Sequence, residues 1–158
     1  MRFRHIMKAD NKKIVVNIRK VIIEMGAPKV GNANEDAELE AMFEAYQNNR
    51  FIYFVVENRN KILGGKGIAP IKNGHPLISE FQEMYFIPGV REKYLEKHMI
   101  QICDDFNKAS NFTQCYIETT SNIQFAQKSY IKTGFKYIDY SMGNTGNSSF
   151  LVWMLRTL

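Results

Sequence analysis

The apolar residues of the first fifty positions recur at helical spacing after a short extended start. Residues 1–7 are typical of a strand, and from there the apolar side chains fall on one helical face. That face is formed by Ile14, Ile18, Val21, Ile22 and Met25. Asp10 or Asn11 can cap this helix, and the Gly-Ala-Pro sequence at 26–28 ends it.

A second helix is predicted over residues 36–47. Its apolar side chains, Leu39, Met42, Phe43 and Tyr46, share one face. The polar stretch before it is expected to be a loop.

The middle of the chain changes to extended patterns. Residues 51–57 are a continuous apolar run, residues 58–60 are turn formers, and residues 61–69 form a second strand, so the two strands are predicted to be a hairpin. A third strand over 77–86 then leads into a helix over 90–107, and the whole junction spans residues 79–97.

In the last third of the chain, predicted strands and a predicted helix alternate. We predict a strand over 114–119, a helix over 123–133 that ends at Gly134, and strands over 135–140 and 150–155. A strand–helix–strand unit implies a parallel pair, whereas hairpins imply antiparallel pairing. The sequence therefore predicts a single α/β domain over 1–158, with a mixed central sheet flanked by helices.

The composition narrows the class of protein. With 158 residues, 45% of them hydrophobic and 23% charged, the chain is long enough for one domain with a sizeable core. It has no apolar run of the roughly 20 residues that span a bilayer, and its first residues do not resemble a signal peptide. We expect a cytoplasmic protein with no membrane partner, and Cys103 and Cys115 to be core thiols rather than a disulfide.

The net charge of +5 permits an anionic ligand or nucleic acid. The basic residues are scattered, however, and form no stripe interleaved with aromatic residues, so nucleic acid is not an expected partner. The three histidines show no metal-ligand spacing, so no metal site is predicted.

Two stretches of the sequence are candidates for an anion-binding site. Gly64-Gly65-Lys66-Gly67 lacks the spacing of a phosphate loop and lies within a predicted strand, where a bulge or a close backbone approach is the simpler explanation. The junction at 79–97 is the stronger candidate, because a strand that runs into a helix N-terminus presents unpaired backbone N–H groups.

Several segments together resemble the GNAT superfamily of N-acetyltransferases. Ala126-x-x-x-Tyr130-x-x-x-Gly134-Phe135 is similar to that family's A-x-x-L-Y-x-x-x-G-F segment. Residues 84–91, with Pro88 and Arg91, resemble the family's x-V-x-P-x-x-R strand end, and residues 57–65 its usual hairpin. The resemblance covers nearly the whole chain and implies a largely antiparallel sheet with a splayed parallel strand pair.

The resemblance also implies acetyl-coenzyme A as acetyl donor and a small-molecule or peptide amine as acceptor. Members of the family are often homodimers, so a homodimer is a possible assembly. The donor's pantetheine arm would bond backbone groups at Met84, Tyr85 and Phe86. Its pyrophosphate would lie on the loop that opens the next helix, formed by Arg91, Glu92, Lys93, Tyr94, Leu95 and Glu96.

Two residues are the candidates for catalysis. The resemblance implies that Tyr130 is the general acid beside the thioester sulfur; the alternative is a packed aromatic. Glu80 is the candidate general base, ahead of Glu83, and its alternative is a hydrogen-bonded strand carboxylate. Strict alternation places Glu80, Gln82 and Met84 on one face of the strand, unless a bulge intervenes. Residues 26–35 would contribute to the choice of acceptor.

The pyrophosphate loop departs from the family pattern R/Q-x-x-G-x-G/A. Both small positions carry larger residues here, Tyr94 and Glu96, although Arg91 matches. The departure leaves open an alternative to an enzyme, a GNAT-like module that binds a ligand or protein and has lost efficient coenzyme binding.

Overall fold

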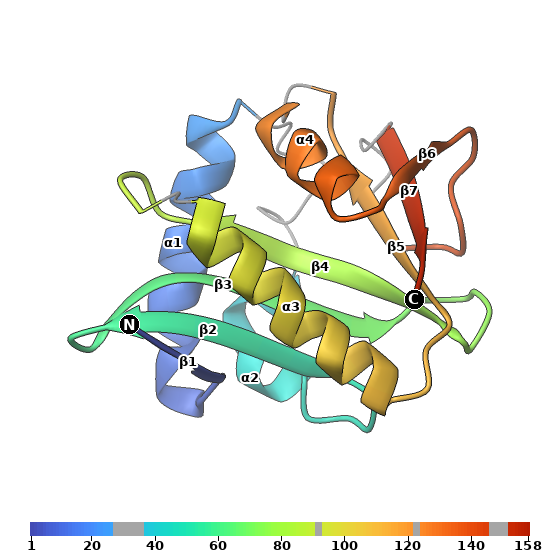
Figure 1. Ribbon diagram of the computed structural model, residues 1–158. Helices are drawn as coiled ribbons and strands as arrows, with labels where there is room; N and C mark the ends of the chain where they lie inside the picture. Colours follow the sequence, from blue (N-terminus) through green and yellow to red (C-terminus); the bar gives the residue numbers. More distant parts are fainter. Residues whose placement is uncertain (27–36, 91–92, 122–123, 146–151) are drawn as a thin grey trace.

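The computed structural model describes residues 1–26, 37–90, 93–121, 124–145 and 152–158 (Figure 1). Its strands are β1 (Arg2–His5), β2 (Ile52–Asn58), β3 (Lys61–Pro70), β4 (Ile78–Phe86), β5 (Gln114–Thr119), β6 (Lys136–Ile138) and β7 (Val152–Thr157). Its α-helices are α1 (Asn11–Glu24), α2 (Met42–Ala45), α3 (Lys93–Ala109) and α4 (Gln124–Lys132), joined by short 3-10 turns at Lys8–Asp10 and Ala37–Ala41.

The strands form one seven-stranded sheet in the order β1-β2-β3-β4-β5-β7-β6. Every neighbouring pair is antiparallel except β4 and β5, which are parallel. The predicted α/β fold, a largely antiparallel mixed sheet with one parallel pair, is confirmed.

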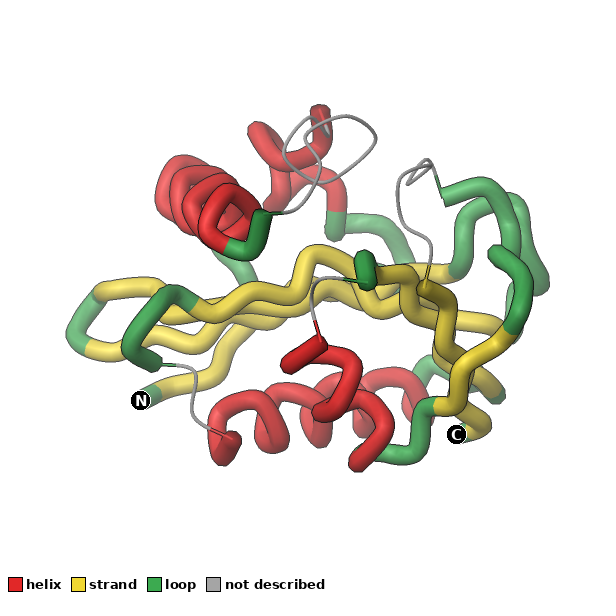
Figure 2. The backbone as a smooth tube through the Cα atoms, turned by 90° about the horizontal axis from the view of Figure 1, so that it is seen from above, coloured by secondary structure: helices red, strands yellow, loops and turns green. Residues whose placement is uncertain are grey.

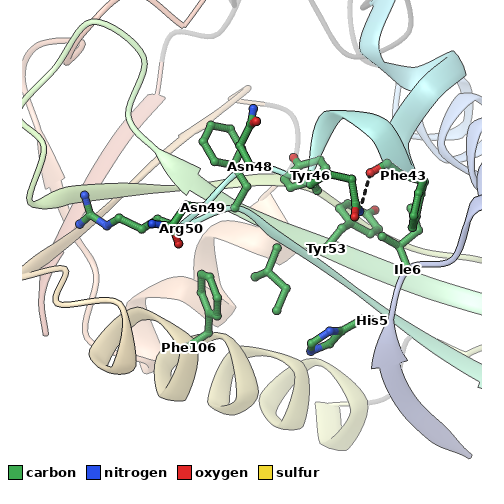
Figure 3. A pocket seen from close by; sticks show the side chains of 12 residues that line it. His5, Ile6, Phe43, Tyr46, Asn48, Asn49, Arg50, Tyr53 and Phe106 are labelled. Atoms are coloured by element: carbon green, nitrogen blue, oxygen red, sulfur yellow. Dashed lines mark hydrogen bonds between the residues drawn. The ribbon is translucent and has the colours of Figure 1, made fainter.

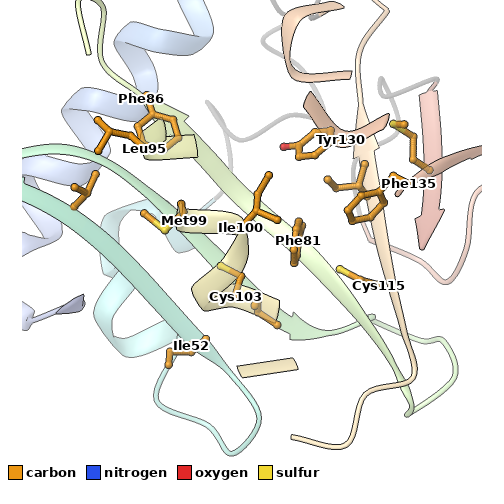
Figure 4. Packing of buried hydrophobic residues seen from close by; sticks show 14 of the residues in the cluster. Ile52, Phe81, Phe86, Leu95, Met99, Ile100, Cys103, Cys115, Tyr130 and Phe135 are labelled. Atoms are coloured by element: carbon orange, nitrogen blue, oxygen red, sulfur yellow. The ribbon is translucent and has the colours of Figure 1, made fainter. Parts of the chain in front are cut away.

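Helices cover both faces of the sheet, as the edge-on view of Figure 2 shows. Residues of α1 and α2 pack with β2 and β3 in one core cluster that includes Ile14, Met42 and Val55. Residues of α3 and α4 pack in the other, which includes Leu95, Tyr130 and Phe81 (Figure 4). We call these the α1 face and the α3 face of the sheet.

The first helix follows its sequence pattern, but its cap does not. Ile14, Ile18 and Val21 are buried as their spacing predicts. Asp10 stands at the N-cap, yet its carboxylate accepts hydrogen bonds from Arg4 and from the Met7 N–H, 2.7 Å away, instead of capping the helix. An ion-pair cluster of Arg4, Asp10 and Glu57 thus ties β1, the start of α1 and β2 together.

The predicted second helix is much shorter than its pattern suggests. Only a 3-10 turn and one α-helical turn form among the described residues, because Ala41 leaves helical geometry at φ −135°. The Phe43 N–H, in the first turn of α2, donates to Asn11 Oδ1 at 2.8 Å, so a side chain of α1 takes up this backbone donor. The apolar residues of the pattern nevertheless enter the core, with Leu39, Met42 and Tyr46 buried.

A β-bulge corrects the predicted alternation of β4. Gly65 pairs with Tyr85 and Gly67 with Gln82, so two residues of β4, Glu83 and Met84, stand opposite Lys66. Met84 therefore packs on the α3 face, and Tyr85 packs on the α1 face. Both lie on the faces opposite to those that strict alternation assigns.

The glycines of β3 allow close packing at this bulge. A Cβ at Gly64 would lie 2.6 Å from the backbone oxygen of Tyr85, and one at Gly67 would collide with the Tyr46 ring. Bulge and close approach, rather than a phosphate loop, explain Gly64–Gly67. Cys103 and Cys115 are free, buried core thiols as predicted.

Membrane-spanning helices and metal clusters are both absent from the described residues. None of the helices there is long and apolar enough to cross a membrane. The same residues contain no cluster of three or more His, Cys, Asp or Glu side chains that could hold a metal ion.

Candidate functional site

The parallel strands β4 and β5 pair over a short distance and then separate. Their register runs from Ile78 opposite Gln114 to Glu80 opposite Tyr116, while β4 continues to Phe86 and β5 to Thr119. In Figure 1 the two strands lie together near the C-terminus and diverge toward α4 and the first turn of α3. We call the region where the two strands diverge the β4–β5 opening, and the backbone at Met84–Phe86 belongs to it, beyond the paired part of β4.

Glu80 stands at the last paired position before the opening, on the α1 face. Its side chain is buried, and Gln82 Nε2 donates a hydrogen bond to Glu80 Oε2 at 2.9 Å. Gln82 is held in turn by the Tyr46 hydroxyl, which donates to Gln82 Oε1 at 2.8 Å. Burial raises the pKa of Glu80 to about 7, against the lowering effect of the Gln82 hydrogen bond. A carboxyl group with this pKa can take up and release a proton near neutrality.

A second carboxylate lies across the opening on β5. Glu118 Oε1 accepts a hydrogen bond from the Tyr116 hydroxyl at 2.7 Å, and Glu118 Oε2 accepts one from Thr145 Oγ1 at 2.5 Å. The charge of Glu118 also contributes to the raised pKa of Glu80. The sequence analysis missed Glu118, although its spacing from Tyr116 places both on one face of β5.

Tyr130 approaches the opening from the α3 face. Its ring is buried against Phe135, with 5.6 Å between centroids, in the core layer that Figure 4 shows. Its hydroxyl donates to Met84 Sδ at 3.4 Å, on the part of β4 that β5 does not pair. Burial holds the pKa of Tyr130 well above its ordinary value, so the group is a neutral phenol that can donate a proton to a sulfur atom.

The structure does not bring Glu80 and Tyr130 into contact. They lie on opposite faces of the sheet and flank the same opening. A reacting group between the strands would have the carboxylate on one side and the phenol on the other. For Glu83, the second candidate base, the structure describes the backbone only.

The residues of the predicted pyrophosphate loop have different environments. Arg91 and Glu92 lie outside the described residues, as does most of the predicted acceptor loop, and Lys93 begins α3. Tyr94 is 67% exposed and stacks on His98, with 6.0 Å between ring centroids. Leu95 is fully buried in the core.

Glu96 points inward rather than toward solvent. Its side chain is buried, and burial raises the pKa of its carboxyl, against the lowering effects of a hydrogen bond with Ser129 on α4 and of the charge of Lys66. Glu96 thus faces the interior between α3 and α4. The sequence predicts Glu96 as part of the pyrophosphate loop, whereas Lys66, the buried lysine near it, stands out there only as part of the glycine-rich stretch Gly64–Gly67.

A separate cavity of about 460 Å³ lies at the start of β2, where β1 has ended (Figure 3). His5, Tyr46, Arg50 and Phe106 are among its lining residues. Neither Glu80 nor Tyr130 lines it, so this cavity does not contain the candidate catalytic groups.

Comparison with known proteins gives the chain its family. No family model matches it. The protein named "Uncharacterized N-acetyltransferase YjgM" of Escherichia coli strain K12 is 35% identical over 156 residues, which cover 98% of this chain and 93% of that protein.

Solved structures share the fold at low sequence identity. An acetyltransferase of the GNAT family from Staphylococcus aureus Mu50 superposes with a TM-score of 0.87 at 18% identity, over 99% of this chain and 98% of that one. A GNAT superfamily phosphinothricin acetyltransferase from Sinorhizobium meliloti, solved in complex with AcCoA, gives 0.79 at 17% identity over 99% and 88%. With a relative of this similarity along almost its whole length, and with this fold, the chain belongs to the GNAT superfamily of N-acetyltransferases.

Proposed function

We propose that this protein transfers an acetyl group from acetyl-coenzyme A to the nitrogen of a small-molecule or peptide amine. The observation that carries the proposal is the β4–β5 opening, with a carboxyl group of pKa about 7 on one side and a buried phenol on the other. Acetyl-coenzyme A supplies the acetyl group as a thioester.

Glu80 is the proposed general base. An amine must lose a proton before or during its attack on a thioester, and Glu80 can accept that proton when it is ionised. The Tyr46–Gln82–Glu80 chain of hydrogen bonds fixes the carboxylate on the α1 face of the opening. The acceptor amine is therefore expected on that face, where Glu118 adds a second carboxylate that attracts a cationic amine.

Tyr130 is the proposed general acid. When the carbon–sulfur bond breaks, the electron pair goes to sulfur, and the Tyr130 hydroxyl is placed to give that sulfur a proton. Its present acceptor is already a sulfur atom, Met84 Sδ, so the geometry of the hydroxyl suits a sulfur acceptor. The opening thus fits a thioester on the α3 face.

The start of α3 is the proposed seat of the pyrophosphate, which rests on the backbone N–H groups of a helix N-terminus. The inward orientation of Glu96 supports this, because the carboxylate lies in the interior instead of among those N–H groups. The alternative, a GNAT-like binding module without activity, is not favoured for a chain whose relative is named an N-acetyltransferase.

Calorimetric titration of the purified protein with acetyl-coenzyme A tests the proposal. We expect micromolar affinity for acetyl-coenzyme A, and much weaker binding of adenosine diphosphate, which lacks the pantetheine arm. Thiol release in the presence of a panel of amines then identifies the acceptor. If millimolar acetyl-coenzyme A gives no heat, the protein is not an enzyme of this kind.

A further inference from the structure

Lys66 is a lysine in the buried core, where charged side chains are rare. It lies in the middle of β3 between Gly65 and Gly67, and its side chain is fully buried on the α3 face. A lysine is almost never fully buried unless it is paired, because its ammonium loses the favourable interaction with water. An aliphatic residue would fill this space at lower cost.

The contacts of the ammonium are concentrated at the candidate general acid. Lys66 Nζ lies 3.1 Å from Met84 Sδ and 3.5 Å from the Tyr130 hydroxyl oxygen. It also lies over two aromatic rings, 3.9 Å from the centroid of Phe81 and 4.9 Å from that of Tyr130. Figure 4 shows Phe81 and Tyr130 in the same core. Sulfur, phenol oxygen and π-electron density are all acceptors for a cation, so they compensate part of the cost of burial.

The charged and titratable groups that face Lys66 come from four elements. Glu96 and Cys103 on α3, Cys115 on β5 and Arg156 on β7 act on its charge, and Tyr130 on α4 touches it. Of these, Glu96 favours the ammonium form and Arg156 opposes it. Burial is the largest influence and lowers the pKa of Lys66 to about 8, so the ammonium form still predominates at neutral pH.

The Tyr130 hydroxyl accepts one hydrogen bond and donates another, and Lys66 determines which is which. The ammonium is a donor only, so the Tyr130 oxygen accepts from Lys66 and its own O–H is left to donate elsewhere, in this structure to Met84 Sδ. The lysine therefore fixes the direction of the phenolic proton as well as placing a positive charge beside the oxygen.

We propose that Lys66 is a positioning residue for acetyl transfer: it holds the Tyr130 O–H toward the leaving sulfur and stabilises the phenolate that remains after the proton has moved. The inference deepens the proposed function and rests on it. As the carbon–sulfur bond breaks, sulfur keeps the electron pair and receives the Tyr130 proton. The negative charge then lies on the Tyr130 oxygen opposite the Lys66 ammonium, while the amine proton is on Glu80, and water restores both groups afterwards.

The test is a double-mutant cycle with Lys66→Met and Tyr130→Phe, measured with acetyl-coenzyme A and the acceptor from the amine panel. We expect Lys66→Met to lower kcat about tenfold or more, a part of the 10²- to 10⁴-fold that a general acid contributes, with little change in KM. In the Tyr130→Phe background the same substitution is expected to cost almost nothing, because Lys66 acts through Tyr130.

The pH dependence of kcat/KM gives a second test, because a purely structural role of Lys66 would not change it. We expect kcat/KM of the native protein to fall above about pH 8, as Lys66 loses its proton, and this fall to be absent in Lys66→Met. Lys61→Met is the matched control, since Lys61 is an exposed lysine of the same strand, and it should keep the native rate and profile. Methionine is about as long as lysine and is apolar, and the Lys66 side chain is surrounded by the Phe81 and Tyr130 rings and the Met84 sulfur, so the variant should fold.

Failure of this inference is distinguishable from failure of the proposed function. If the native protein is active and Lys66→Met keeps its kcat and pH profile, or if the two substitutions are additive, the role of Lys66 is refuted while the acetyltransferase stands. If the native protein binds no acetyl-coenzyme A and acetylates no amine, the proposed function fails and this inference fails with it.

Discussion

At the scale of single residues, the candidate site depends on groups whose protonation is set by burial. Glu80 and Glu96 have raised pKa values and Lys66 a lowered one, and in each case desolvation is the largest cause. For Glu80 and Lys66, with pKa values of about 7 and about 8, the neutral and charged forms are close in free energy near neutral pH, which is what proton transfer there requires. The side chains that flank the β4–β5 opening are thus suited to acid–base chemistry.

Glu80→Gln tests the base directly. The amide keeps the shape of the side chain but cannot accept the amine proton, so we expect kcat/KM to fall by about 10²- to 10⁴-fold. The native kcat/KM should rise with pH through about 7, as Glu80 ionises, and this rise should disappear in the variant. Steady-state rates between pH 5.5 and 8 measure both effects.

Glu40→Gln is the control for that substitution. Glu40 is 62% exposed and pairs with Arg19 at the surface, so its replacement should leave the rate and its pH dependence unchanged. A Glu80→Gln protein with the native profile would remove Glu80 from the mechanism.

At the scale of elements, the pairing of β3 with β4 positions the site. The bulge at Glu83 and Met84 turns Met84 toward Tyr130, while Glu80 and Gln82 remain on the α1 face. Without the bulge, the sulfur and the carboxylate would share one face of the sheet. The glycines of β3 allow the neighbouring strands and side chains to come this close.

Two glycine-to-alanine substitutions in β3 compare the cost of crowding a backbone atom with the cost of crowding a side chain. In Gly64→Ala the new Cβ would lie 2.5 Å from the Phe86 ring and also 2.6 Å from the Tyr85 carbonyl oxygen, which cannot move without disturbing β4. In Gly67→Ala it meets the ring and hydroxyl of Tyr46, which are side-chain rather than backbone atoms. We expect both to destabilise the fold, by about 1–3 kcal/mol for overpacking, with Gly64→Ala the more destabilising of the two.

Urea unfolding of both variants measures the difference. Gly67→Ala should also lower activity beyond its effect on stability, because displacing Tyr46 releases Gln82 and so loosens Glu80. Equal loss of stability in the two proteins would mean that β4 adjusts as easily as a side chain does.

At the scale of the whole molecule, the sequence predicts the elements better than it predicts the site. The periodicity of α1, the hairpin of β2 and β3, and Gly134 at the end of α4, with φ +97°, are local features that the sequence carries by itself. The backbone at the start of α2 is bound by Asn11, which is distant in sequence, so no local pattern reveals that contact.

The site depends on the same kind of long-range contact. Met84 faces Tyr130 only because of a bulge that requires β3 beside β4, and no local pattern marks it. Lys66 appears in the sequence as one basic residue in a glycine-rich strand; its burial becomes visible only when α3 and α4 cover that face. Candidate groups could be named from the sequence, but their environments required the fold.

The stability of the whole molecule should depend on pH in two opposite ways. Burial alone would raise the pKa of Asp10, but the hydrogen bonds from Arg4 and the Met7 N–H outweigh it and lower the pKa. The stability that Asp10 contributes is therefore present above its unfolded pKa and is lost as the pH falls through its folded pKa. The folded pKa of Glu80 is raised from 4.5 to about 7, so the folded protein binds more protons than the unfolded chain in that window, and stability falls as the pH rises.

The joint contribution of these two groups alone is most favourable at roughly pH 4–5, below neutrality. At 1.36 kcal/mol per pKa unit, the shift from 4.5 to about 7 means that Glu80 costs on the order of 3 kcal/mol above pH 7. Chemical denaturation between pH 3 and 8 should show the Glu80→Gln protein more stable than the native protein by about this amount at pH 8, with the gap closing toward pH 4. Glu96, whose pKa is also raised, leaves a smaller slope of the same sign in the variant, and Glu40→Gln should follow the native curve. Parallel curves for the native and Glu80→Gln proteins would mean that Glu80 has the same pKa in the folded and unfolded chain. Glu80 would then have no raised pKa, and the argument for a general base with a pKa near 7 would fail.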